Sequence, residues 1–445
     1  SCLSLACEAG EIARATPPSI RIKAPGASPG TAGRRATPFA MPAGAGGLYG
    51  RWHTSRYHSW RNEAAALRVD LMPRPPSALQ PADLDIQARC PLLNDPAVAI
   101  AWGRSAGLAD PSLASRVIAD LVDHGLTFDL VESICGRLPA LLPAVSDPDR
   151  VLVTLGRFIA AVRSPLSTAT LFDRDPDSLG VLLAIFSASP FLAEIVIADP
   201  EAWEEVRISR GRPEKKEALA AMLAAEIGGS DDPDVVLLAL RRFRLRQTLR
   251  IAYGDIVASN RLETVVGQLS HMADCIVAAA VRTAVAAVER QRGVPCGPDG
   301  GRATLAVIAL GKLGGTELNY SSDIDLVFVH SADGRVDGPR PCTNQEFFDR
   351  VVQETLRLVS APSPLGSGHR VDLRLRPHGS AGAASLSREA MLQYYDRQGR
   401  TWERQAWVKA RCVAGDESLG GRLLAELEPW IYRRWLTRAD ISGIK

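Results

Sequence analysis

Several features that mark common protein classes are missing from this sequence. No uninterrupted apolar run approaches the ~20 residues that a membrane-spanning helix needs. The eight cysteines are scattered, without a CxxC pair or a Cys/His spacing typical of zinc sites, which favours free thiols in a reducing cytoplasm. Formal net charge is only +2. These absences argue against a membrane protein, a zinc protein and a general nucleic-acid-binding surface.

Charge and composition set the N-terminal stretch apart. Residues 1–75 hold ten Lys/Arg against four Asp/Glu, so the remainder carries a net charge of −4. Residues 1–78 are rich in Ala, Gly, Pro, Ser and Arg and have little periodic apolar pattern, which predicts disorder. The stretch begins without Met, and Met41 and Met72 are later starts. We interpret it as a translation artefact that is not native, with a transit peptide as the alternative.

The rest of the sequence suggests more than one domain, because 445 residues exceed the usual size of one core. Residues 79–292 show long Ala/Leu/Arg-rich helical patterns and predict a helical domain. A Gly/Pro-dense break opens residues 293–386, which predict the catalytic core, and a helical pattern returns over 387–445. The predicted class is α+β, a sheet-containing domain flanked by all-helical regions.

The segment 293–386 contains three predicted strands and one helix. Residues 304–310 form a continuous apolar run of strand length, and 323–330 form a second strand. A helix is predicted over 345–361, and 369–377 alternate strictly as a third strand.

Two acids open the second predicted strand. Because side chains alternate along a strand, Asp323 and Asp325 share one face while Ile324, Leu326 and Phe328 share the other. Carboxylates about 7 Å apart can converge on hard cations. Magnesium prefers carboxylate and phosphate oxygens and supports phosphoryl transfer, so this pair predicts a Mg²⁺ site.

A glycine-rich turn joins the first two strands. Gly311, Gly314 and Gly315 would let backbone N–H groups approach phosphates, and Lys312 or Ser322 would add donors. The spacing is not that of a Walker motif. We therefore predict a phosphate-binding turn of another kind.

The third predicted strand places its polar residues on one face. Asp372 would complete a three-carboxylate site or act as general base, and Arg374 and Arg376 would suit phosphate oxygens. An isolated Asp-x-Asp is usually a solvated pair. The combination with the apolar strand, the glycine turn and this strand predicts a metal site instead.

Weaker cationic features have two interpretations each. One helix face carries arginines at every fourth residue, which indicates either a solvated face or contact with an acidic surface: Arg242, Arg246 and Arg250. Cations beyond residue 400 are either structural or within reach of phosphates: Arg404, Lys409 and Arg411. His369 is interpreted as structural or exposed.

Three consecutive segments carry a resemblance to a known family. They are GKLGGTELNYSSDIDLVFVH, RVDLRLRPHGSAG and YYDRQGRTWERQAWVKARCVAGD. They resemble the glutamine synthetase adenylyltransferase/adenylyl-removing enzymes, whose fold belongs to the polymerase β-like nucleotidyltransferases. The wording ELNYSSDIDL is similar to the N-terminal, adenylyl-removing half, and the chain stops where the family continues, so we expect a truncated C-terminal segment.

The resemblance implies an activity and roles for matching residues. Asp323, Asp325 and Asp372 match the metal carboxylates, and Gly314, Gly315 and Ser322 match the nucleotide-phosphate turn. The implied reaction is Mg²⁺-dependent phosphorolysis, in which phosphate removes AMP from a tyrosine of glutamine synthetase and gives ADP. Glutamine synthetase is then the protein substrate, and a PII-type signalling protein and glutamine are implied regulators.

Other functions remain open from the sequence. The same metal site would serve ATP-dependent adenylylation of glutamine synthetase. A regulatory nucleotide-binding fragment belongs to a different class, and the three intact acids argue against it. A nucleotidyltransferase acting on RNA or antibiotics would share the fold, but the acidic balance of residues 76–445 argues against it. We expect no nucleic-acid or membrane partner.

Overall fold

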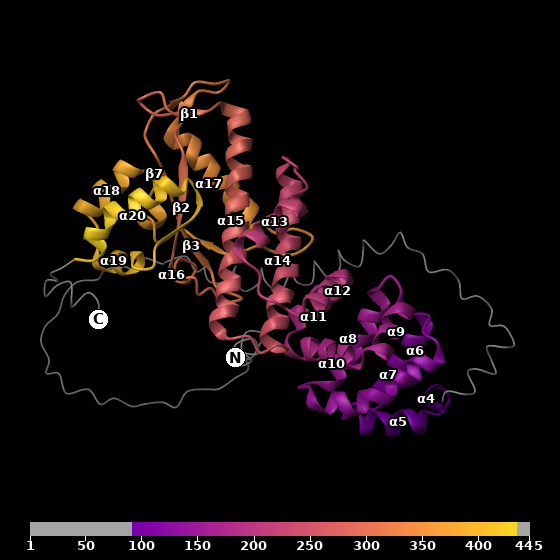
Figure 1. Cartoon of the computed structure of the whole chain (residues 1–445). Helices are drawn as coiled ribbons and strands as arrows, with labels where there is room; N and C mark the ends of the chain where they lie inside the picture. The colour runs from indigo at the N-terminus through magenta and orange to yellow at the C-terminus, as the bar shows by residue number, and fades with distance from the viewer. Residues whose placement is uncertain (1–90, 434–445) are drawn as a thin grey trace, which may run out of the picture. The chain divides into compact units, whose positions relative to one another are not determined.

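The computed structural model describes residues 91–433, all within one compact unit (Figure 1). The predictions for residues 1–78, and the start and end of the segments predicted at 79–292 and 387–445, lie outside the described residues. Five cysteines are described, and all are free thiols as expected: Cys135, Cys275, Cys296, Cys342 and Cys412.

Short helices fill the chain up to residue 227. They are α4 Pro91–Asn94, α5 Pro96–Ser105, α6 Leu113–Asp123, α7 Phe128–Leu141, η1 Leu142–Ala144, α8 Pro148–Ala161, α9 Pro165–Arg174, α10 Pro176–Ala188, α11 Pro190–Ala198, α12 Pro200–Ser209 and α13 Lys216–Ile227. Many begin with proline, whose fixed φ and missing N–H suit the first helical position. The Asp147 carboxylate caps α8 by accepting from the Arg150 backbone N–H.

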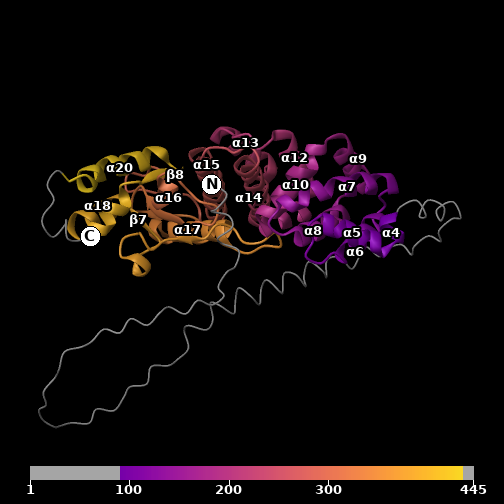
Figure 2. The same cartoon turned by 90° about the horizontal axis from the view of Figure 1, so that it is seen from below.

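Two long helices lie side by side in both views (Figures 1 and 2): α14 Pro233–Ile256 and α15 Leu262–Arg292. By length and composition alone α15 could cross a membrane, but 67% of its most apolar window is buried inside the protein, which is typical of a core helix. The arginine face on α14 is not simply solvated. Arg246 pairs with Asp199 at 2.7 Å, and Arg250 is buried and donates to Gln268 at 2.7 Å.

The main sheet is mixed, with strand order β6-β3-β2-β8 and β7 also pairing with β3. Its strands are β2 Leu305–Leu310, β3 Ile324–His330, β6 Val371–Asp372, β7 Ser385–Ser387 and β8 Arg411–Gly415. β2 pairs antiparallel with β3 and β8, whereas β6 and β7 run parallel to β3. A smaller sheet contains β1 Pro295–Cys296, β4 Arg335–Val336 and β5 Cys342–Thr343. Helices and a mixed sheet confirm the α+β class.

Helices cover both faces of the main sheet. Leu326 and Phe328 face a core shared with α15 and α17 (Asn344–Ser360). Val327 and Val329 alternate to the opposite face, against residues of α18 Arg388–Arg397, α19 Thr401–Trp407 and α20 Glu417–Ile431. Near-continuous apolar runs are expected where a strand is buried on both faces.

Two strand-level predictions are wrong. The third predicted strand, 369–377, forms only β6, because the Asp372 carboxylate accepts from the Arg374 backbone N–H at 2.7 Å and turns the chain. The next positions along β3 are paired by β7. Residues 411–415, predicted to continue a helical pattern, are strand β8, because β2 offers them an edge to pair with. η2 (Gly379–Ala381) lies between β6 and β7.

Candidate active site

The three predicted carboxylates come together at one end of the sheet. Asp325 and Asp372 are direct register partners on the parallel strands β3 and β6. Neighbouring strands lie about 4.8 Å apart, so these two side chains are close neighbours. Asp323 immediately precedes β3, and Ile324 between the two acids is fully buried. The predicted alternation of acids and apolar residues is therefore confirmed.

The electrostatics of the acids differ. Burial raises the pKa of Asp325, and the charges of Asp372 and Asp323 raise it further. Asp372 has a lowered pKa because Arg374 donates to its carboxylate, and the two form an ion pair at 2.5 Å. Asp323 is held by the Arg370 guanidinium. Of the three acids, Asp325 is the one for which the described residues supply no arginine ion pair.

The glycine turn after β2 packs tightly against this site. Gly311 opens the short helix α16 (Gly311–Gly314) at φ +55°, and a Cβ there would overlap the Asp325 Oδ2 atom. Gly314 is buried, and a Cβ on it would lie 2.7 Å from the Ala309 carbonyl oxygen and still closer to that of Lys409. Of these three glycines, Gly315 is the exposed one. Close packing explains the first two glycines without any bound phosphate.

The predicted phosphate donors fall into two groups. Lys312 and Ser322 meet, with the ammonium donating to the hydroxyl at 3.2 Å, and Arg374 is largely exposed beside Asp372. Arg376 instead donates to carbonyl oxygens of its own loop, including that of Leu373 at 2.8 Å. The structure therefore brings Lys312, Ser322 and Arg374 to the acids and gives Arg376 a loop-holding role.

The cations beyond residue 400 stabilise the fold around the turn. Arg411 donates to the Leu313 carbonyl and pairs with the fully buried Asp274 at 2.7 Å, where Lys216 also binds at 2.9 Å. Lys409 pairs with Glu317. For Arg404, which is buried and stacks on a tryptophan ring, the structural interpretation also holds.

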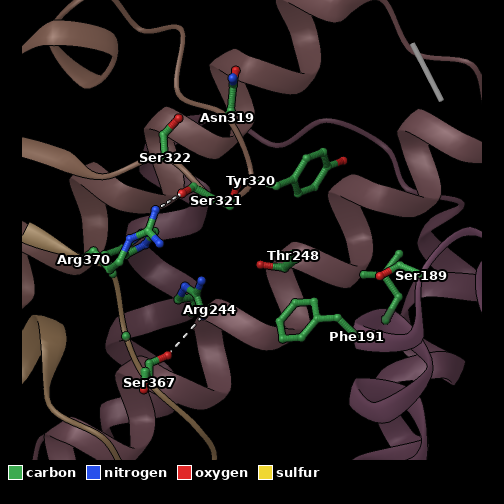
Figure 3. A pocket seen from close by; sticks show the side chains of 13 residues that line it. Ser189, Phe191, Arg244, Thr248, Asn319, Tyr320, Ser321, Ser322, Ser367 and Arg370 are labelled. Carbon is green, nitrogen blue, oxygen red and sulfur yellow. Dashed lines mark hydrogen bonds between the residues drawn. The ribbon is translucent and has the colours of Figure 1, made fainter. Parts of the chain in front are cut away.

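A cavity of about 530 Å³ adjoins the acids and was not predicted (Figure 3). It is lined by Phe191 of α11, by Arg244 and Thr248 of α14, by the segment 319–322 before β3 and by 367–370 before β6. Arg370 lies two residues before Asp372, and this spacing could have indicated that its side chain lies near the acids. Arg244 gave no signal, because only folding brings α14 beside the strand ends.

The donor set fits a hard cation. Three carboxylates lie at neighbouring positions beside the turn, and Mg²⁺ prefers carboxylate oxygens. Burial first, and then the charges of Asp372 and Asp323, raise the pKa of Asp325. Across residues 91–433, however, no group of three His, Cys, Asp or Glu side chains forms a ready-made metal site. Asp323 and Asp372 face Arg370 and Arg374 instead. Metal binding would require one of these arginines to release its carboxylate.

Comparison with known proteins places this site in a family. The α+β fold with acids at its strand ends is consistent with a nucleotidyltransferase-like domain. A sequence model described as "Glutamate-ammonia ligase adenylyltransferase" matches residues 179–426, so the chain belongs to this family.

Curated relatives share the name bifunctional glutamine synthetase adenylyltransferase/adenylyl-removing enzyme. The protein of Thioalkalivibrio sulfidiphilus is 38% identical over 268 residues, 59% of this chain and 27% of the relative. That of Xanthomonas campestris is 40% identical over 206 residues, 46% and 22% of the two chains. That of Stenotrophomonas maltophilia is 35% identical over 314 residues, 69% and 31%. The matched region spans less than a third of each relative.

Proposed function

We propose that this chain is an adenylyl-removing nucleotidyltransferase with a polymerase β-like catalytic core, acting on glutamine synthetase. The observation that carries the proposal is the register pairing of Asp325 with Asp372, with Asp323 two residues away. Membership of the adenylyltransferase family supports the substrate class. The sequence ELNYSSDIDL, which contains Asp323 and Asp325, is similar to the removing half of the family and supports the removing direction.

The proposed reaction is phosphorolysis of a phosphodiester. A phosphate oxygen forms a bond to the adenylyl phosphorus, the bond from phosphorus to the tyrosine oxygen breaks, and that oxygen takes up a proton, which gives ADP and free tyrosine. Phosphate arrives as an anion, so no side chain has to deprotonate the nucleophile. The chain must instead bind two anionic reactants in line and offset their charge.

The side chains at the site divide these tasks. Asp323, Asp325 and Asp372 would hold Mg²⁺, which when bound would neutralise charge on the transferred group. Arg374, largely exposed beside Asp372, offsets charge on phosphate oxygens once its carboxylate is engaged elsewhere. Lys312, in contact with a serine hydroxyl on the turn, donates to the nucleotide.

The forward reaction is the second candidate. Transfer of AMP from ATP requires a base for the tyrosine hydroxyl, a role for which Asp372 is the candidate. The same acids would serve both directions, so the consumed co-substrate decides between them. A PII-type protein, glutamine and a cytoplasmic location remain predictions from the family resemblance.

The test supplies the chain with adenylylated glutamine synthetase, magnesium and either phosphate or buffer, and in parallel with unmodified synthetase and ATP. Phosphate-dependent ADP release supports the removing activity, and AMP incorporation moves the assignment to the forward reaction. Asp325→Asn should abolish turnover, with Asp396→Asn, an exposed acid on α18, as the matched control. Inactivity of the wild-type chain in both assays would favour a regulatory fragment.

A further inference from the structure

Arg244 of α14 stands out for its lack of partners among the described residues. Its Nη1 atom donates to the Ser367 carbonyl oxygen over a long 3.3 Å, and its enclosed Nε–H has no hydrogen-bond partner. Among the described residues no carboxylate forms an ion pair with it within 4 Å. Two arginines of the same helix do pair with acids, Arg242 with Glu226 at 2.5 Å and Arg246 with Asp199 at 2.7 Å. Arg244 is thus a half-enclosed cation without a counter-ion among residues 91–433.

The immediate neighbours of Arg244 increase the electrostatic cost of enclosing its charge. Arg241 is buried, and its guanidinium donates hydrogen bonds to the Leu358 and Ala361 carbonyl oxygens at the end of α17. His369 is 5% exposed, and its Nε2 atom has no hydrogen-bond partner. Burial and both arginines lower the pKa of His369 to about 3, so the ring is neutral and its nitrogen remains unsatisfied. Enclosed groups of this kind ordinarily have partners.

A cavity beside Arg244 has room for a ligand that would satisfy these groups. Arg244 lies on the wall of the 530 Å³ cavity, with the Thr248 hydroxyl one turn further along α14 (Figure 3). Ser322 and Ser367 also line the cavity, and Arg370 borders it where it contacts Asp323. A ligand here is therefore within reach of two arginines and several hydroxyl groups, beside the proposed catalytic acids.

We propose that this cavity binds a phosphate-group oxyanion, with the Arg244 guanidinium as its principal ligand. A guanidinium presents a fork of N–H donors that matches tetrahedral oxyanions, and the hydroxyls supply further donors. The proposal rests on the proposed function, in which phosphate has to be held next to the adenylyl group. It would explain how phosphate is preferred to water as the nucleophile.

Two sources share this chemistry, namely inorganic phosphate and the phosphate of the adenylyl group. Calorimetric titration of the whole chain with inorganic phosphate, and separately with AMP, tells them apart. Wild type should bind, and Arg244→Gln should weaken binding about tenfold or more. Arg244→Lys keeps the charge without the fork and should fall between them. Arg242 does not line the cavity and pairs with Glu226 at 2.5 Å, so Arg242→Gln should bind like wild type.

The two probes identify the source. Loss of phosphate affinity with a raised KM for phosphate in the phosphorolysis assay assigns the cavity to the nucleophile. Loss restricted to AMP, with a raised KM for adenylylated synthetase, assigns it to the adenylyl group. Equal affinities of wild type and Arg244→Gln for both probes, or no binding by wild type, would overturn the proposal.

Two controls separate this proposal from its basis. Arg244→Gln should melt at or above the wild-type temperature without phosphate, because it removes an unpaired charge, so weaker binding is not caused by unfolding. Asp325→Asn should lose turnover yet keep phosphate affinity. An active Asp325→Asn variant would refute the proposed function while leaving the phosphate site intact.

Discussion

Replacing Gly311 by alanine should damage catalysis far more than stability. The residue adopts φ +55°, where an L-residue costs roughly 1–2 kcal/mol. The atom that the new Cβ would overlap is Asp325 Oδ2, the end of a side chain that can rotate away. The added steric cost is therefore small, but the carboxylate is displaced by about 1 Å, which can reduce turnover roughly 100-fold.

Gly228→Ala is the matched control for this prediction. Gly228 ends α13 at φ +63°, and a Cβ on it meets nothing within 4 Å. Urea titration should therefore give the two variants similar losses in free energy of unfolding, about 1–2 kcal/mol each. Only Gly311→Ala should lose phosphorolysis activity. Wild-type turnover by Gly311→Ala, or inactivity of Gly228→Ala, would refute the reasoning.

Three further predictions test the packing and charge around the site. Gly314→Ala places its Cβ against two backbone carbonyls, which cannot rotate away, and should cost about 3 kcal/mol by urea titration. Asp274→Asn leaves a buried position with two cations unpaired and should cost about 3–5 kcal/mol by the same measurement. The two acids of β3 and β6 should respond to pH with opposite signs. The folded pKa of Asp325 is raised above its ordinary value of 3.8, so ionisation of this carboxyl destabilises the folded state as pH rises above 3.8. The melting temperature of Asp325→Asn should therefore rise relative to that of wild type from pH 3.5 to 7. The folded pKa of Asp372 is lowered, so its ionised carboxylate stabilises the folded state above pH 3.8, and this stabilisation is lost as pH falls through the folded pKa. The melting temperature of Asp372→Asn should therefore fall relative to that of wild type as pH rises over the same range. Shifts of the same sign in the two variants would contradict the opposite pKa shifts of the two acids.

Elements with strong local patterns were predicted well. The apolar runs at 304–310 and 323–330 match β2 and β3 to within one residue. The helix predicted at 345–361 matches α17, where Thr343 and Glu346 form a capping box. Such patterns are set by neighbouring residues, so they can be read without knowing the partner elements.

Elements whose state depends on a partner were predicted poorly. β8 has no strand pattern that stands out from the helical sequence around it, and only pairing with β2 defines it. The alternation over 369–377 predicted a longer strand than the structure contains. β6 ends early because the Asp372 carboxylate accepts a hydrogen bond from the Arg374 backbone N–H. Local periodicity measures which residues can pack, and it does not reveal where an edge is open.

The sequence by itself determined the acidic chemistry of this protein and the order of its elements. Asp323 and Asp325 lie on one face of a strand because side-chain alternation is a covalent property of the extended chain. Tertiary structure alone decided that Asp372 pairs with Asp325, that Arg376 holds its loop, and that Arg244 faces a cavity beside these acids. Those relations join residues far apart in the chain, and the packing of α14 and the sheet, not any local pattern, sets their distances.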